Sequence, residues 1–186
     1  MSTQLKVLAV WALLVFGANL VPSQSEALSI TPNTIPVELK IDLKQAVHKP
    51  GVCYSNDQCR KLAEAVFFEG RGEPLKGQYA IAYTIINRRD SGKYADDVSG
   101  VVNQKRRGIC QFSYICQIKA KDRKAVIAGD DESWQRALDV AYDTYFYEVS
   151  DPTRGGEFFH TRQVKPVWRH ELQKTLALGN HIFYRS

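Results

Sequence analysis

The sequence lacks several features that would assign it to a functional class at once. It has no dense basic run beyond Lys105-Arg106-Arg107, which disfavours nucleic acid as a partner. It has no H-E-x-x-H or similar compact pair of metal ligands, no internal repeats and no low-complexity segments. Its most apolar run, Val7 to Ala18, is too short for a comfortable membrane span. The chain has 186 residues, which is long enough for one domain with a substantial hydrophobic core.

The first 27 residues have the pattern of a signal peptide. Lys6 is the only charge before the apolar run, and Ser25-Glu26-Ala27 places small residues where signal peptidase requires them. We expect cleavage after Ala27, with an uncleaved signal anchor as the alternative, and export in both cases. The location is then the periplasm or the cell wall. Residues 1–27 contain one lysine and one glutamate, so the exported part keeps the net charge of +5, which suits an anionic cell-wall polymer or a membrane surface.

The four cysteines form two pairs with a spacing of six, Cys53 with Cys59 and Cys110 with Cys116. Four cysteines allow three connectivities, and in an oxidising compartment the two local disulfides are the favoured choice. Zinc binding by all four is the alternative, although this spacing is wider than the usual gap between zinc ligands.

Residues 28–52 contain three prolines and predict an extended linker or N-terminal arm, followed by a folded domain over 53–186. Within that domain, Ser55 and Gln58 resemble a capping box for a first helix. The periodicity predicts further helices from Pro74 to about Arg89, over Asp97 to Gln104, and from Asp130 or Asp131 to Val149. Short antiparallel strands are predicted over Glu157 to His160, Thr175 to Leu178 and His181 to Tyr184.

The stretch Leu62 to Pro74, LAEAVFFEGRGEP, carries the strongest chemical signal. Leu62, Ala65, Val66 and Glu69 share one helical face, so a carboxylate closes an apolar stripe. Such a carboxylate is costly to bury as a charge unless it is paired or its pKa rises. Glu69 is therefore a candidate general acid at a helix end, and the alternative is a surface residue or a structural partner of Arg71.

Four blocks in order, AEAVFFEGRGEPLKGQYAIAYTIINR, VVNQ…CQFSYIC, FFHT…VKPVW and GNHIFYR, resemble the cell-wall hydrolases of the spore cortex-lytic (SleB/CwlJ) type. The resemblance implies an α+β, mainly helical domain like lysozymes and lytic transglycosylases, with a small antiparallel β element. It also implies action on peptidoglycan glycan strands, with Glu69 as the catalytic glutamate of the E-x-R-G-E motif. Gly70 stands where many relatives have alanine, and no separate peptidoglycan-binding repeat is evident. The second point favours a general exported or phage-encoded lysin (an endolysin) over a role in spore germination.

Glycosidic cleavage requires an acid and a means of stabilising an oxocarbenium-like state. By family analogy one glutamate, Glu69, acts first as acid and then as base, and the sugar's 6-hydroxyl replaces water to give a 1,6-anhydro product. Glu73 is the second catalytic candidate, with an orienting role preferred. We expect no cofactor and a monomer. The predicted substrate-binding residues are Arg71, Gln111, Phe112, Ser113, Tyr114, His160, Trp168 and His181.

Two other functions stay open from the sequence. A zinc-dependent N-acetylmuramoyl-L-alanine amidase would use His160, His170 and His181 with Glu69 or Glu171 as ligands. Histidines on alternating strands are more often packed and hydrogen-bonded than metal-bound. The third reading is a non-catalytic peptidoglycan-binding module.

Overall fold

A computed structural model describes residues 49–186. The predicted signal peptide and all but the last four residues of the predicted arm lie outside the described part of the chain. Residues 49–52 are helical rather than extended, because they begin α2 (Lys49–Ser55), which packs on α8. The boundary at residue 53 itself stays a prediction. Within residues 49–186, no helix has the length and apolar character that crossing a membrane requires.

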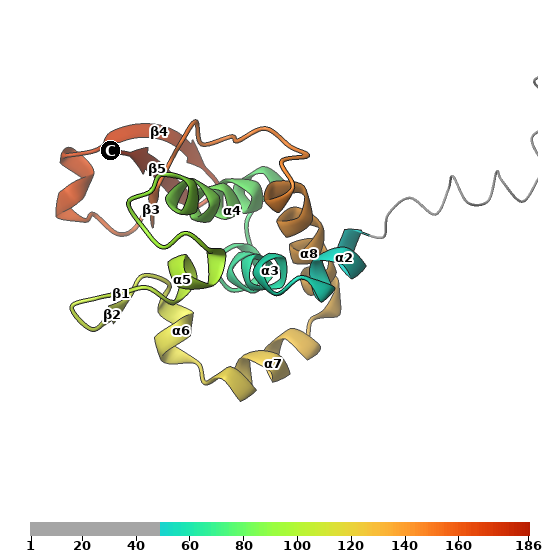
Figure 1. The fold of residues 1–186 in the computed structure, drawn as a ribbon. Coiled ribbons are helices and arrows are strands. Elements are labelled where there is room, and N and C mark those ends of the chain that lie inside the picture. The colour runs from blue at the N-terminus through green and yellow to red at the C-terminus, as the bar shows by residue number, and fades with distance from the viewer. Residues whose placement is uncertain (1–48) are drawn as a thin grey trace, which may run out of the picture. The chain divides into compact units, whose positions relative to one another are not determined.

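Four helices form the centre of the folded unit (Figure 1). They are α3 (Asp57–Gly70), α4 (Leu75–Asp90), α5 (Val98–Asn103) and α8 (Asp131–Tyr145). α3 packs on the other three and is covered at its N-terminal end by α2. Its predicted apolar face is fully buried at Leu62, Ala65 and Val66, so this face directs α3 into the core.

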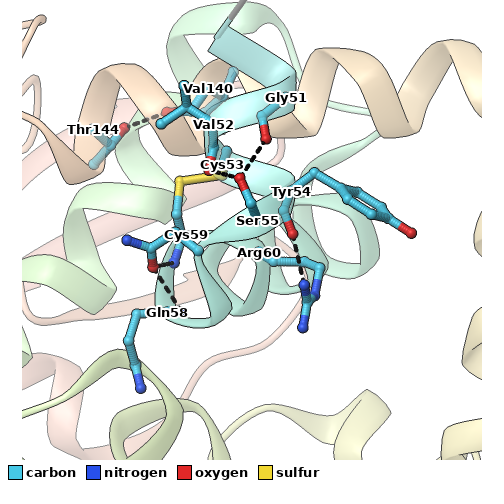
Figure 2. Close-up of a disulfide and its surroundings, with 11 residues drawn as sticks. Gly51, Val52, Cys53, Tyr54, Ser55, Gln58, Cys59, Arg60, Val140 and Thr144 are labelled. Atoms are coloured by element: carbon cyan, nitrogen blue, oxygen red, sulfur yellow. Dashed lines mark hydrogen bonds between the residues drawn. A yellow bond between two sulfur atoms is a disulfide. The ribbon is translucent and has the colours of Figure 1, made fainter.

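The cap of α3 differs from the prediction. Asn56, rather than Ser55, is the N-cap, and its side chain accepts hydrogen bonds from the backbone N–H groups of Gln58 and Cys59. The Ser55 hydroxyl instead donates back to the carbonyls of Gly51 and Val52 in α2 (Figure 2). An asparagine side chain competes well for this position, so the capping-box interpretation was wrong by one residue.

The C-terminal strands follow the prediction closely. β3 (Phe158–Thr161), β5 (His181–Arg185) and β4 (Gln173–Leu178) form an antiparallel sheet in the order β3-β5-β4, with Gly179-Asn180 as the turn between β4 and β5. One face of this sheet packs on α4 through Phe159, Leu176 and Phe183. A short 3-10 helix, η1 (Val167–His170), connects β3 to β4.

The segment between α5 and α8 contains elements that the sequence did not predict. A two-residue hairpin, β1 (Lys105–Arg106) and β2 (Ile109–Cys110), leads into α6 (Ser113–Gln117) and α7 (Ala120–Ala128). α7 contains no buried residue, so it has no apolar periodicity by which it could be recognised. The fold is thus α+β and mainly helical, as predicted.

Both local disulfides are confirmed: Cys53 is bonded to Cys59 and Cys110 to Cys116. The first joins α2 to α3 beneath α8 (Figure 2), and the second closes the loop that leads into α6. With all four thiols paired, the zinc-binding alternative for the cysteines is wrong.

Candidate active site

Glu69 is the penultimate residue of α3 and lies half-buried at its C-terminal end. Burial raises the pKa of its carboxyl group from the ordinary 4.5 to about 7. Within residues 49–186 its side chain forms no hydrogen bond or ion pair that would offset this desolvation; in particular, the expected alternative partner Arg71 is directed elsewhere. A carboxyl group in these surroundings holds its proton near neutral pH and can give it to a leaving group.

Arg71 is the C-cap of α3, and its contacts are with residues other than Glu69. Its guanidinium is 5.0 Å from the centre of the Phe67 ring and 3.8 Å from a carboxylate oxygen of Asp130. The ion pair connects the end of α3 to the start of α8, and substrate binding by Arg71 stays a prediction.

Tyr114 packs against Phe68, the residue that precedes Glu69. Its ring stacks on Phe68 of α3 with centroids 4.7 Å apart, and its buried hydroxyl has no hydrogen-bond partner in the described part of the chain. Burial is the largest cause that raises the pKa of Tyr114, and the negative charges of Glu64 and Glu69 add to it. The hydroxyl thus stays protonated, and within residues 49–186 it is a buried donor without an acceptor.

The remaining predicted residues of this loop divide between core and surface. Phe112 is 2% exposed and packs between Phe159 and the guanidinium of Arg88, which makes it part of the core. Gln111 and Ser113 are exposed on either side of it. The sequence left two roles open for Phe112, packing in the core or stacking on a sugar ring. The structure places it in the core.

Glu73 follows the end of α3 and is held on several sides. One carboxylate oxygen accepts a hydrogen bond of 3.0 Å from the backbone N–H of Asn180, and the other lies 3.3 Å from Nδ1 of His181. Burial lowers the pKa of His181, and the Glu73 charge opposes this shift. These contacts, which we call the Glu73 clasp, connect the turn before α4 to the β4–β5 turn.

Gly179 makes this close approach possible. It has a φ of +55°, and a Cβ atom there would lie 1.8 Å from a carboxylate oxygen of Glu73. The sequence predicted a turn at Gly179-Asn180 but not its partner. Backbone donors such as the Asn180 N–H carry no residue-specific signal that could have indicated the clasp.

His160 and Trp168 belong to an aromatic cluster at the sheet. A ring nitrogen of His160 lies 3.0 Å from the Tyr184 hydroxyl, and Trp168 packs edge-on against both rings. No hydrogen bond in the described residues links this cluster to Glu69. Among residues 49–186, no three histidine, cysteine, aspartate or glutamate side chains are grouped so that they could hold a metal ion. The amidase alternative therefore has no ligand set in this part of the chain.

Comparison with known proteins places the chain in a family. The model of the Cell Wall Hydrolase family matches residues 72–184, a range that includes Glu73 and begins three residues after Glu69. Spore cortex-lytic enzymes are similar over much of the chain. The one from Bacillus subtilis (strain 168) is 41% identical over 140 residues, and the one from Bacillus cereus (strain ATCC 14579) is 43% identical over 134 residues.

These alignments cover 74% and 70% of this chain but only 44% and 45% of the relatives, so the chain spans less than half of their length. The solved catalytic domain of the germination-specific lytic transglycosylase SleB from Bacillus anthracis is 26% identical, with a TM-score of 0.54. That match covers 71% of this chain and 97% of the solved domain. The similarity therefore concerns a catalytic domain, and this chain belongs to the cell wall hydrolase family.

Proposed function

We propose that this protein is a lytic transglycosylase that cleaves the bond between N-acetylmuramic acid and N-acetylglucosamine in peptidoglycan, with Glu69 as its acid and base. The observation that carries the proposal is the desolvated carboxyl group of Glu69, whose pKa of about 7 keeps a proton available at the end of α3. The relatives named as lytic transglycosylase and cortex-lytic enzymes support the same reaction.

In the proposed reaction, Glu69 protonates the glycosidic oxygen, and the bond to the anomeric carbon breaks as an oxocarbenium-like state forms. The Glu69 carboxylate then takes the proton of the 6-hydroxyl group of the same sugar. That oxygen bonds to the anomeric carbon and closes a 1,6-anhydro ring. Glu69 ends protonated, no water is consumed, and one carboxyl group serves both steps.

Glu73 has a different role in this proposal. A hydrolysis with water would call on a second carboxylate near the reacting bond. The side chain of Glu73 is about 5% exposed, and its two oxygens contact the Asn180 N–H of the β4–β5 turn and Nδ1 of His181. We assign Glu73 to positioning, since these contacts hold the segment that follows Glu69 in place.

Peptidoglycan as substrate places the protein outside the cytoplasm, which agrees with the two disulfides. We propose that it acts there as a monomer, in the periplasm or at the wall. Of the predicted substrate-binding residues in the loop that leads into α6, Gln111 and Ser113 are exposed, whereas the Tyr114 hydroxyl is buried and has no partner in the described residues.

The test is mass spectrometry of the fragments that the protein releases from purified sacculi. We expect muropeptides with 1,6-anhydro-muramic acid ends and no new reducing ends. Reducing-end products would instead identify a muramidase that uses water. Free stem peptides, with loss of activity in a chelator and recovery with zinc, would identify an amidase.

A further inference from the structure

The β1–β2 hairpin carries the basic run Lys105-Arg106-Arg107, which has no part in the proposed reaction. Arg106 pairs with Ile109 across the hairpin. Arg107 and Gly108 form the turn, and both have a positive φ, of 53° and 81°. Two-residue turns with positive φ at both positions favour asparagine and glycine. An arginine is therefore costly for the turn itself, and it places a cation at the tip.

The positive charge of this hairpin is not balanced by neighbouring acids. Its three cationic side chains are exposed, and none of them forms an ion pair within residues 49–186. The sequence has no acidic residue between Asp97, which precedes α5, and Asp122 in α7. Glu157 acts on the same ring as Arg106 does, that of Tyr94, but its buried carboxylate is already paired with Lys93 at 3.3 Å. The hairpin consequently attracts an anionic partner.

The hairpin also exposes an aliphatic side chain. Ile109 is 72% exposed, and among the large hydrophobic side chains of residues 49–186 only Val167, at 81%, is more exposed. Single exposed aliphatic side chains are common on protein surfaces. Ile109 differs from these because it stands opposite Arg106, so the tip combines apolar surface with cations.

A second segment, residues 162–169, has the same combination. It contains η1 and exposes Val164 and Val167, at 54% and 81%. Its cationic residues are two arginines and one lysine, and it contains no acid. Glu171, which is exposed just beyond this segment, is the only acidic residue that follows Glu157 in the sequence. We call residues 162–169 the η1 loop.

The hairpin and the η1 loop border the same cluster of side chains. Burial raises the pKa of Tyr94, and the charges of Arg88 and Arg106 oppose this rise, so the hairpin lies close to the Tyr94 ring. The guanidinium of Arg88 lies 5.4 Å from the centre of that ring and 5.7 Å from the centre of the Phe158 ring. The Phe158 ring in turn lies 5.7 Å from that of Trp168 in η1. Figure 1 shows the hairpin and the η1 segment at the same edge of the folded unit.

The base of the hairpin is fixed to the fold. Cys110 pairs with Lys105 and is bonded to Cys116, and the Gln111 N–H donates to the Gln104 carbonyl at 3.0 Å. A tip that is held in this way loses little conformational freedom when it binds a partner.

We propose that the hairpin and the η1 loop together form a docking surface for an anionic lipid membrane. A soluble wall polyanion would be attracted by the cations, but such a hydrated polymer offers little apolar surface to Ile109 and Val167. A bilayer interface accepts both kinds of side chain, because anionic head groups there lie above apolar acyl chains. The proposal rests on the proposed export for its location, and it does not depend on which bond Glu69 cleaves.

The test is sedimentation of the full chain with vesicles of equimolar phosphatidylcholine and phosphatidylglycerol, compared with vesicles of phosphatidylcholine alone. We expect saturable binding to the anionic vesicles that weakens with salt, and much weaker binding to the neutral ones. Ile109→Ser should weaken binding to the anionic vesicles about tenfold, because the isoleucine side chain no longer leaves water. Arg107→Gln should weaken it about fivefold, which is the effect of one cation at an anionic surface.

Leu75→Ser and Lys76→Gln are the matched controls, and both should bind like wild type. Leu75 is 52% exposed, but it lines a groove together with the acidic residues Asp139 and Asp143. Lys76 is exposed and forms no ion pair in the described residues. The apolar run Val7 to Ala18 is present in every variant, so it cannot produce differences between them.

Three results would overturn the proposal. The first is equal binding to neutral and anionic vesicles, and the second is wild-type binding by Ile109→Ser. The third is slower release of fragments from purified sacculi, which contain no lipid, by Ile109→Ser at an unchanged free energy of unfolding. That result, or binding to soluble wall polyanions that needs Arg107 but not Ile109, would identify a wall polymer as the partner. The identity of the cleavage products tests the proposed function separately.

Discussion

Glu69 and Glu73 stand four residues apart in one motif, yet their surroundings differ in almost every respect. Glu69 closes the buried face of α3, and in the described part of the chain its carboxyl group has no hydrogen-bond or ionic partner. Glu73 lies beyond the helix end, where the Asn180 N–H and His181 contact its two oxygens. The carboxyl group of Glu69 is thus without partners among the described residues, whereas that of Glu73 is held by contacts.

This difference separates two uses of a carboxylate. Desolvation without a partner favours the protonated form and produces an acid that works near neutral pH. Contacts to both oxygens hold the side chain in one orientation, which suits positioning. The comparison therefore assigns proton transfer to Glu69 and orientation to Glu73, and each variant below tests one side of it.

The largest effect is expected for Glu69→Gln. The substitution keeps the shape of the side chain but removes the transferable proton, and general acid–base catalysis typically contributes about 10²–10⁴-fold. Release of anhydro-muropeptides should fall by at least that factor, as measured by mass spectrometry of digested sacculi. Glu73→Gln is the paired control, because its amide oxygen can still accept from Asn180, and it should lose much less. Wild-type turnover in Glu69→Gln would refute the assignment.

The second prediction concerns stability as a function of pH. The pKa of Glu69 is about 7 in the folded state and about 4.5 in the unfolded chain, so between these values the folded state holds a proton that the unfolded chain has lost. Stability therefore falls as pH rises through this window, by up to about 3 kcal/mol above it. Glu69→Gln removes this loss.

Urea unfolding of both proteins at about pH 4 and about pH 8 measures the effect, because any linkage appears as a change in their difference. The two should be similar at the lower pH, and the variant should be more stable at the higher pH. A difference that is the same at both pH values would mean that Glu69 is not desolvated, and it would remove the contrast with Glu73.

Much of the fold could be predicted because its elements carry strong periodic patterns. The apolar face of α3, the almost entirely apolar α4 and the alternating strands β3 to β5 each bury a recognisable set of side chains. α7 could not be predicted, since a helix without buried residues has no such pattern. The N-cap Asn56 was missed because a neighbouring serine fitted a known motif equally well.

The candidate site was predictable only where a residue's own segment determined its environment. Glu69 follows from the stripe of α3 on which it lies. The clasp joins Glu73 to a backbone N–H 107 residues away, and no pattern in the sequence relates the two. His160 and Trp168 were predicted to bind substrate because of their residue types, but they pack together in an aromatic cluster at the sheet.

Gly179→Ala tests the clasp itself. Gly179 and Gly92 both have a positive φ, of +55° and +69°, but only at Gly179 would the new Cβ meet another atom, a Glu73 oxygen at 1.8 Å. Gly92→Ala should therefore cost only the strain of the left-handed backbone, roughly 1 kcal/mol. Gly179→Ala should cost about 1–3 kcal/mol more, because the clash displaces the turn or the carboxylate.

The measurement is the free energy of unfolding of both variants, together with their turnover of sacculi. Only Gly179→Ala should lower turnover, since only that change moves the segment that follows Glu69. Equal stability of the two variants would show that Glu73 is free to move away, and the positioning role would then be lost.

The smallest effect is a difference between the two disulfides. Each closes a loop with a sequence separation of six, so the loop-entropy estimate gives a similar loss of about 2.4 kcal/mol in the free energy of unfolding when either is removed.

The positions of the two disulfides differ, however. Cys53–Cys59 fastens α2 to the start of α3, whereas Cys110–Cys116 encloses Tyr114, which stacks on Phe68 beside Glu69. Replacing both cysteines of the second pair by serine should therefore lower turnover more than the same change in the first pair, at similar unfolding free energies. Equal turnover in two stably folded variants would show that the Tyr114 loop holds its place without its bridge, and that the surroundings of Glu69 depend on α3 alone.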